Sequence, residues 1–136
     1  RESRRIMGDY VIDADELSAG KRFPDVIVHD ALFIVDIHNP DGAGQAEDKI
    51  QYCQPYDLPY RCFLPKGLEG LMVAGRCISG THRAHASYRV MSICMAMGEA
   101  VGIAAALSVQ NCCTPRQLDV TLLQKTMTDK GIVLFD

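Results

Sequence analysis

The sequence LMVAGRCISGTHRAHASYRVMSICMAMGEAVGIAAALSVQ, residues 71–110, links two apolar runs through a polar loop. The first run, residues 70–75, has no alternation of apolar and polar residues, which is typical of a strand covered on both faces, as in a parallel or mixed sheet. It ends at Gly75, a residue that permits a tight turn and the close approach of a ligand. Ser87 is a favourable N-cap, and the second run predicts a helix from there to about residue 110.

Shorter elements are expected on both sides of this stretch. Runs of β-branched and aromatic residues predict strands at 10–12, 26–28, 32–35, 58–64 and 132–135. An acidic first turn predicts a single helical turn at 13–17. The run Thr114-Pro115-Arg116-Gln117 combines an N-cap, a proline and a capping-box glutamine ahead of a helix at 118–130. We therefore expect an α+β fold, in which a short mixed β-sheet packs on one long apolar helix and a short C-terminal helix follows.

The long helix has two interpretations. Between Val90 and Val109 its only charge is Glu99, a run of this length can span a bilayer, and Gly98-x-x-x-Gly102 resembles a helix-pairing motif. However, alanine, glycine and serine outnumber leucine and isoleucine, and the charge is central. Small residues also let another backbone come close. We therefore favour a buried core helix over a membrane span.

The composition is that of a soluble globular domain. The 136 residues suffice for one modest core, and 48% of them are hydrophobic. A net charge of −3 leaves no basic excess to displace counterions from phosphates, which argues against nucleic-acid binding. The six cysteines contain no C-x-x-C pair, and we interpret them as reduced thiols of a cytoplasmic protein.

The loop between strand and helix is rich in hydrogen-bond donors. Its donors are Thr81, His82, Arg83, His85 and Arg89. The helix that follows offers unpaired N–H groups and partial positive charge to an anionic or electron-rich ligand. The loop therefore predicts a ligand site, against the alternative of a polar surface loop that caps a core helix.

Segments along nearly the whole chain carry a family resemblance. They are RESRRIMGDY at 1–10, DIHNPDG at 36–42, YDLPYR at 56–61, LMVAGRCIS at 71–79, His82, AHAS at 84–87, RVM at 89–91 and MAMGEA at 95–100. Together they resemble the C-terminal region of the FAD-dependent oxidoreductase family, two-domain flavoproteins related to the fumarate reductase type. The resemblance implies a fragment of an α/β flavoprotein: part of a substrate-side or cap region at 1–67, the last strand and helix of the FAD-binding domain at 68–110, and a helical tail at 111–136.

The resemblance also implies roles for single residues. The implied flavin-contacting residues are Gly75, Arg76, Thr81, Arg89, Val90, Met91 and Ser92. The helix amides would face the pyrimidine edge of the isoalloxazine, where helix-terminal positive potential stabilises the anionic reduced flavin. On the substrate side the resemblance implies Arg61, His82 and His85 as catalytic candidates, together with Arg4 or Arg5, for a small-molecule substrate. Which of them transfers a proton stays open.

One departure from the family pattern limits this function. The family's dinucleotide fingerprint, G-x-G-x-x-G, occurs nowhere in the 136 residues, and Gly42-Ala43-Gly44 lacks its third glycine. We therefore expect the chain, which begins at Arg1, to be an excised piece that binds FAD weakly or not at all and is inactive alone. Its partner would be the missing N-terminal dinucleotide-binding domain.

Two other classes of function stay open. Cys77 with His82-x-x-His85 offers three metal ligands, but the spacing is not that of a zinc site and a fourth ligand is lacking, so we expect no metal. A non-enzymatic interaction module is the other class, because an apolar helix face without its partner favours a homo-oligomer. His29 and His38 are expected to be surface histidines at strand ends.

Overall fold

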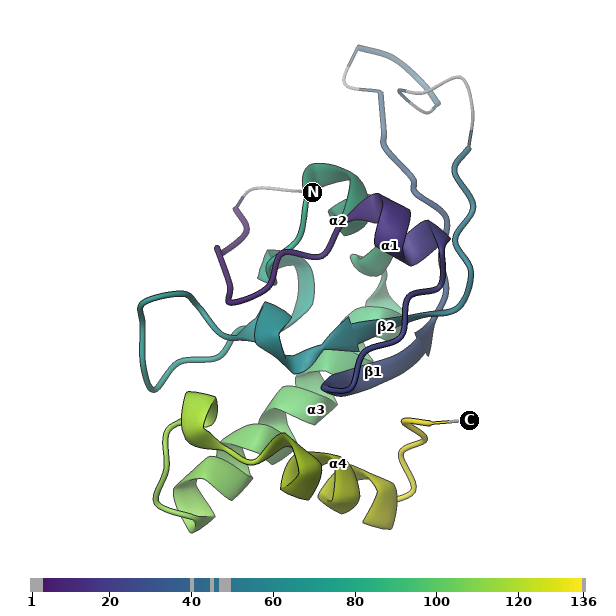
Figure 1. Cartoon of the computed structure of the whole chain (residues 1–136). Coiled ribbons are helices and arrows are strands. Elements are labelled where there is room, and N and C mark those ends of the chain that lie inside the picture. Colours follow the sequence, from purple (N-terminus) through teal and green to yellow (C-terminus); the bar gives the residue numbers. More distant parts are fainter. Residues whose placement is uncertain (1–3, 40, 45, 47–49, 136) are drawn as a thin grey trace.

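The computed structural model describes residues 4–39, 41–44, 46 and 50–135, so Arg1 to Ser3 and Pro40 of the family motifs lie outside the described residues. The helices and strands (Figure 1) are α1 (Ala14–Ser18), β1 (Val26–Ala31), β2 (Tyr56–Pro59), the 3₁₀ helices η1 (Tyr60–Phe63) and η2 (Gly75–Cys77), α2 (His82–Tyr88), α3 (Met91–Gln110), η3 (Pro115–Gln117) and α4 (Val120–Asp129). The α+β class is confirmed.

The two strands form an antiparallel sheet in the described part of the chain, where a mixed sheet was expected. Val26 pairs with Pro59 and Ala31 with Tyr56, and the register shifts twice between these ends. Asp30 lies at the second shift with a φ of +52°, a conformation that is uncommon for a residue with a side chain. Helix α3 runs behind the sheet and contacts β1, while α4 crosses below it (Figure 1).

The helix predicted from Ser87 to about residue 110 corresponds to α3, which begins later, at Met91, and Ser87 lies inside the separate helix α2 rather than at an N-cap. Thr81 caps α2 by accepting a hydrogen bond from the Ala84 amide at 3.3 Å. Ser87 is buried inside α2, where its hydroxyl donates to the Phe33 carbonyl at 2.7 Å. The chain then leaves helical geometry at Val90, whose ψ is 155°, before α3 begins. The cap prediction was wrong because the hydroxyl of Ser87 forms tertiary hydrogen bonds instead of capping a helix.

The other expected strands are shorter than predicted or are replaced. The segment 58–64 leaves β2 after Pro59 and turns into η1. Residues 71–74 have no regular secondary structure and belong to no ladder among the described residues, Gly70 is a bend with a φ of +71°, and the Val73 amide bonds the Phe63 carbonyl at 3.0 Å. The strands predicted at 10–12 and 32–35 are reduced to single isolated bridges at Ile12 and Val35. Residues 132–135 form no strand.

Helix α3 is buried on one face only. The buried residues follow helical spacing at Ile93, Met97, Ala100, Ala104 and Ser108. The opposite face is open to solvent and includes Met91, Met95 and Val109. Among the described residues α3 is the helix long and apolar enough to cross a membrane by length and composition, a test that core helices of soluble proteins also pass, and 33% of its most apolar window is buried.

Candidate functional site

The turn at Gly75 and the first turn of α3 lie against each other. Gly75 opens η2 with a φ of +77°, a conformation that side chains rarely adopt. A β-carbon built on Gly75 would lie 3.9 Å from the Sγ atom of Cys94, which is in the first turn of α3. The structure thus brings together two segments that the sequence separates by a loop of more than ten residues.

The loop between them is fastened to the N-terminal segment. The Thr81 amide donates to the Ile12 carbonyl at 2.9 Å, and the Arg5 Nε atom donates to the Gly80 carbonyl at 2.9 Å. Gly80 itself has no room for a side chain, because a β-carbon there would lie 2.6 Å from the Tyr88 hydroxyl. The start of α2 is therefore held firmly beside Arg5.

His85 is a buried histidine and His82 an exposed one. His85 has 2% of its surface exposed and stands edge-on to the ring of Tyr88, with ring centroids 5.6 Å apart. Burial, and then the charges of Arg5 and Arg89, lower the pKa of His85 to about 4. His85 is therefore neutral near pH 7 and, because its pKa is lowered, is a weaker proton acceptor than an ordinary histidine.

Arg89 stands between the two helices and bonds the segment that follows β1. Its Nη2 atom donates to the Asp36 carbonyl at 2.6 Å and lies 3.5 Å from an Asp36 carboxylate oxygen. These contacts hold the Arg89 guanidinium against Asp36. The backbone of Arg89 leads into the first turn of α3.

The N-terminus of α3 has no side-chain cap, because the N-cap residue is Val90. Met91 and Ser92 follow it in exposed positions, Met91 with 81% of its surface accessible. The first amides of a helix have no intrahelical acceptor and carry partial positive charge. This helix end suits an anionic or electron-rich group.

Arg61 and Arg76 are exposed side chains outside α2 and α3. Arg61 lies on η1, and its guanidinium donates two hydrogen bonds to Asp25, at 2.8 Å and 3.1 Å, while its backbone amide donates a third at 3.3 Å. Its guanidinium also stands over the ring of Tyr10, 4.9 Å from the centroid. Arg76 lies within η2, directly after Gly75. The roles expected of these two residues stay predictions.

A model of the FAD dependent oxidoreductase family matches residues 1–127. The chain belongs to the FAD-dependent oxidoreductase family. Searches of curated proteins and of solved structures gave no significant match.

The residues of this FAD-dependent oxidoreductase chain are suited to the ring end of FAD but not to its nucleotide end. At the ring end, the positive φ of Gly75 and the uncapped start of α3 suit the approach of a flat, electron-rich ring. At the nucleotide end the fit fails, since the sequence has no G-x-G-x-x-G turn to hold a pyrophosphate. No group of three or more potential metal ligands is found within residues 4–39, 41–44, 46 and 50–135.

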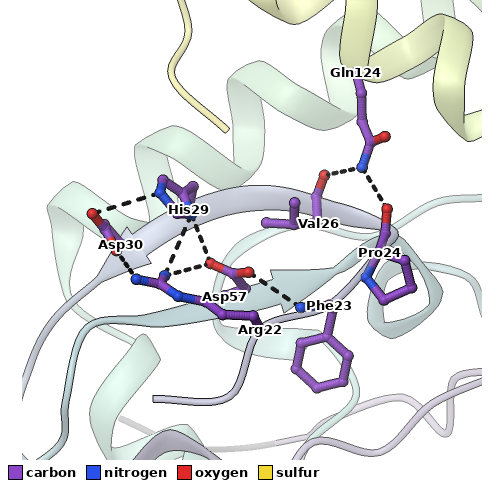
Figure 2. A network of polar contacts seen from close by, with 8 residues as sticks. All are labelled: Arg22, Phe23, Pro24, Val26, His29, Asp30, Asp57 and Gln124. Atoms are coloured by element: carbon purple, nitrogen blue, oxygen red, sulfur yellow. Dashed lines mark hydrogen bonds and ion pairs between the residues drawn. The ribbon is translucent and has the colours of Figure 1, made fainter. Parts of the chain in front are cut away.

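Figure 2 shows a polar network in this oxidoreductase chain that sequence reasoning missed. Asp57 is 2% exposed and accepts hydrogen bonds from Arg22 Nη1 at 2.8 Å, the Phe23 amide at 3.2 Å and His29 Nδ1 at 2.9 Å. The side chain of His29 is 5% exposed, so the expectation of a surface histidine was wrong. The available signal was Asp57 itself, a carboxylate between apolar residues that needs buried partners.

Proposed function

We propose that these 136 residues supply the ring-facing part of an FAD-dependent oxidoreductase of the fumarate reductase type. One observation carries the proposal: the Gly75 turn lies against the first turn of α3, so the two segments expected to approach the flavin are neighbours. Family membership over residues 1–127 supports it. In this proposal the chain is inactive by itself and contributes to a small-molecule oxidation or reduction in the cytoplasm.

We propose that each residue of the site has a role set by its position in the fold. The flavin, when bound, supplies the electron acceptor or donor. Gly75 lets the backbone approach the ring, and the amides of Met91 and Ser92 offer donors and positive potential to its pyrimidine edge. Thr81 fixes the start of α2 by capping it. Arg76 and Arg89 complete the proposed cofactor contacts.

On the substrate side we propose Arg61, His82 and His85, with Arg5 beside the loop. The hydrogen bond from Arg5 to the Gly80 carbonyl supports this proposal, because it holds Arg5 beside the loop. His82 is exposed at the start of α2 and can meet a substrate directly. His85 is neutral and buried, so its proposed part is to relay a proton through its neutral ring behind His82 without keeping the charge.

The exposed face of α3 supports the proposal that a partner domain covers this helix. Residues 68–110 would belong to the FAD-binding domain, with 1–67 on the substrate side and 111–136 as a tail. A helix with Met91, Met95 and Val109 in solvent leaves apolar area that a dinucleotide-binding domain would cover. That domain would bring the pyrophosphate site that these residues lack.

The experiment is to express the full reading frame that encodes these residues and record its flavin absorbance with Gly75→Ala and Gly131→Ala variants. Both glycines have positive φ, +77° and +86°, so the backbone strain is matched, but Gly131 lies beyond α4. The proposal predicts a yellow parent protein, flavin lost or weakened by Gly75→Ala, and flavin retained by Gly131→Ala. A colourless parent, or equal flavin content in both variants, contradicts it.

A self-associating interaction module is the second candidate. The same open face of α3 favours it, because the apolar area would be covered by another copy. A yellow parent protein argues against this module as the main function. A purified chain that stays monomeric in light scattering argues against the homo-oligomer.

A further inference from the structure

The helical geometry is interrupted at the junction between α2 and α3. Arg89 keeps helical geometry as the C-cap of α2, where its amide bonds the His85 carbonyl at 3.3 Å, and Val90 is extended as the N-cap of α3, where its carbonyl accepts from the Cys94 amide at 2.9 Å. The side chain of Val90 makes no capping hydrogen bond to the start of α3. The direction in which the first amides of α3 point therefore depends on contacts that residues 89 and 90 make with the rest of the fold.

The segment 33–38 supplies these contacts along the second half of α2. The Ser87 hydroxyl donates to the Phe33 carbonyl at 2.7 Å. The Asp36 amide donates to the Ala86 carbonyl at 3.4 Å. One turn further, Arg89 donates to the Asp36 carbonyl at 2.6 Å. The segment thus follows α2 to its last turn and ends at the junction.

Asp36 is the residue where the contacts converge. Its carbonyl and carboxylate both face Arg89, and the same carboxylate oxygen that lies 3.5 Å from Arg89 lies 3.1 Å from His38 Nε2. The side chains of Arg89 and Asp36 are mostly shielded, with 14% and 23% exposed. A charged pair shielded in this way is worth more than one in open solvent.

We propose that Asp36 is a positioning residue that fixes Arg89, and through it the direction of the first turn of α3. The consequence for flavin rests on the proposed function, in which these amides face the ring. The positioning of Arg89 by Asp36 involves only residues of this chain. It can therefore be tested separately from flavin binding.

The test is amide hydrogen exchange of the 136-residue chain, followed by mass spectrometry, for Asp36→Asn, Asp36→Glu and Glu69→Gln. Asp36→Asn should speed exchange about threefold in peptides covering residues 89–95, since the ion pair between the Asp36 carboxylate and Arg89 at 3.5 Å is lost while the bond to the carbonyl of residue 36 remains. Exchange at residues 100–110 and in α4 should be unchanged. Asp36→Glu should restore part of the protection.

Glu69→Gln is the matched control, because it removes a carboxylate that binds another arginine, Arg116, at 2.6 Å. It should leave residues 89–95 unchanged. If Asp36→Asn leaves that exchange unaltered, or speeds it equally throughout the chain, the positioning role is wrong. If Asp36→Asn does not fold, Arg89→Lys, which keeps the charge but loses the fixed fork, should give the same local effect.

Discussion

At the scale of single residues, the candidate site depends on what each side chain already binds. Arg89 has its guanidinium on Asp36, and Arg61, although its side chain is 45% exposed, has its own on Asp25. Gly75 contributes by having no side chain at a φ of +77°. His85 contributes a neutral ring. In the proposed site, backbone amides and a buried neutral histidine would therefore act beside the exposed side chains of Arg76 and His82.

His85 makes the stability of the fold depend on pH. Its pKa is lowered from 6.5 to about 4, chiefly by burial. Because the unfolded chain binds the proton more tightly, the contribution of His85 is present above pH 6.5 and is lost as the pH falls from there toward 4. The chain should lose about 1.4 kcal/mol of unfolding free energy per pH unit in this window through this residue.

Urea denaturation at several pH values checks this prediction. His85→Gln should be less stable at neutral pH but should show a flatter pH profile between about 6.5 and 4. Equal slopes for the two proteins would mean that the folded chain accepts the proton on His85 at no cost. Burial of His85 would then not control its protonation.

At the scale of elements, the sequence predicts where structure occurs better than where it ends. The predicted capping-box glutamine is confirmed, because Gln117 accepts a hydrogen bond from the neighbouring Thr114 amide at 3.1 Å and this contact needs no distant residue. The N-cap at Ser87 and the strand at 70–75 were wrong for a common reason. Each depends on a distant group that no local pattern contains. For Ser87 this group is the Phe33 carbonyl, and for residues 70–75 it is a partner strand.

The candidate site follows the same division. The sequence singled out Gly75 and the start of the apolar helix, since a glycine and a donor-rich loop are local signals. It did not reveal that Arg89 is held by Asp36, nor that His29 is buried against Asp57 (Figure 2). Both pairings join residues more than twenty positions apart, and single-sequence patterns carry no information on such pairs.

The network at Asp57 joins the two strands and should be costly to break. Asp57→Asn removes a buried charge that faces Arg22 and His29, and leaves both without a carboxylate at that position. We expect a loss of about 3 kcal/mol of unfolding free energy, against less than about 1 kcal/mol for Glu69→Gln at an exposed pair. Chemical denaturation of both variants measures the difference, and equal losses would show that the network adds no stability.

At the scale of the whole molecule, the chain is folded around its sheet yet leaves one long helix half covered. The buried face of α3 contacts β1, α4 and η2, and the other face carries apolar side chains in solvent. The first turn of α3, which is proposed to face the flavin ring, and the exposed apolar residues lie on the same helix. This arrangement supports the proposal that these residues belong to a two-domain flavoprotein whose other domain would cover the exposed face.

The most direct test is an FAD titration of the purified 136-residue chain, followed by flavin fluorescence and compared with the flavin absorbance of the full-length parent. The account predicts a colourless chain that shows no saturable tight binding of FAD, together with a yellow parent. A chain that purifies yellow, or that binds FAD tightly and at one equivalent, would contradict it, because the ring-facing segment would then hold the cofactor without a dinucleotide-binding domain.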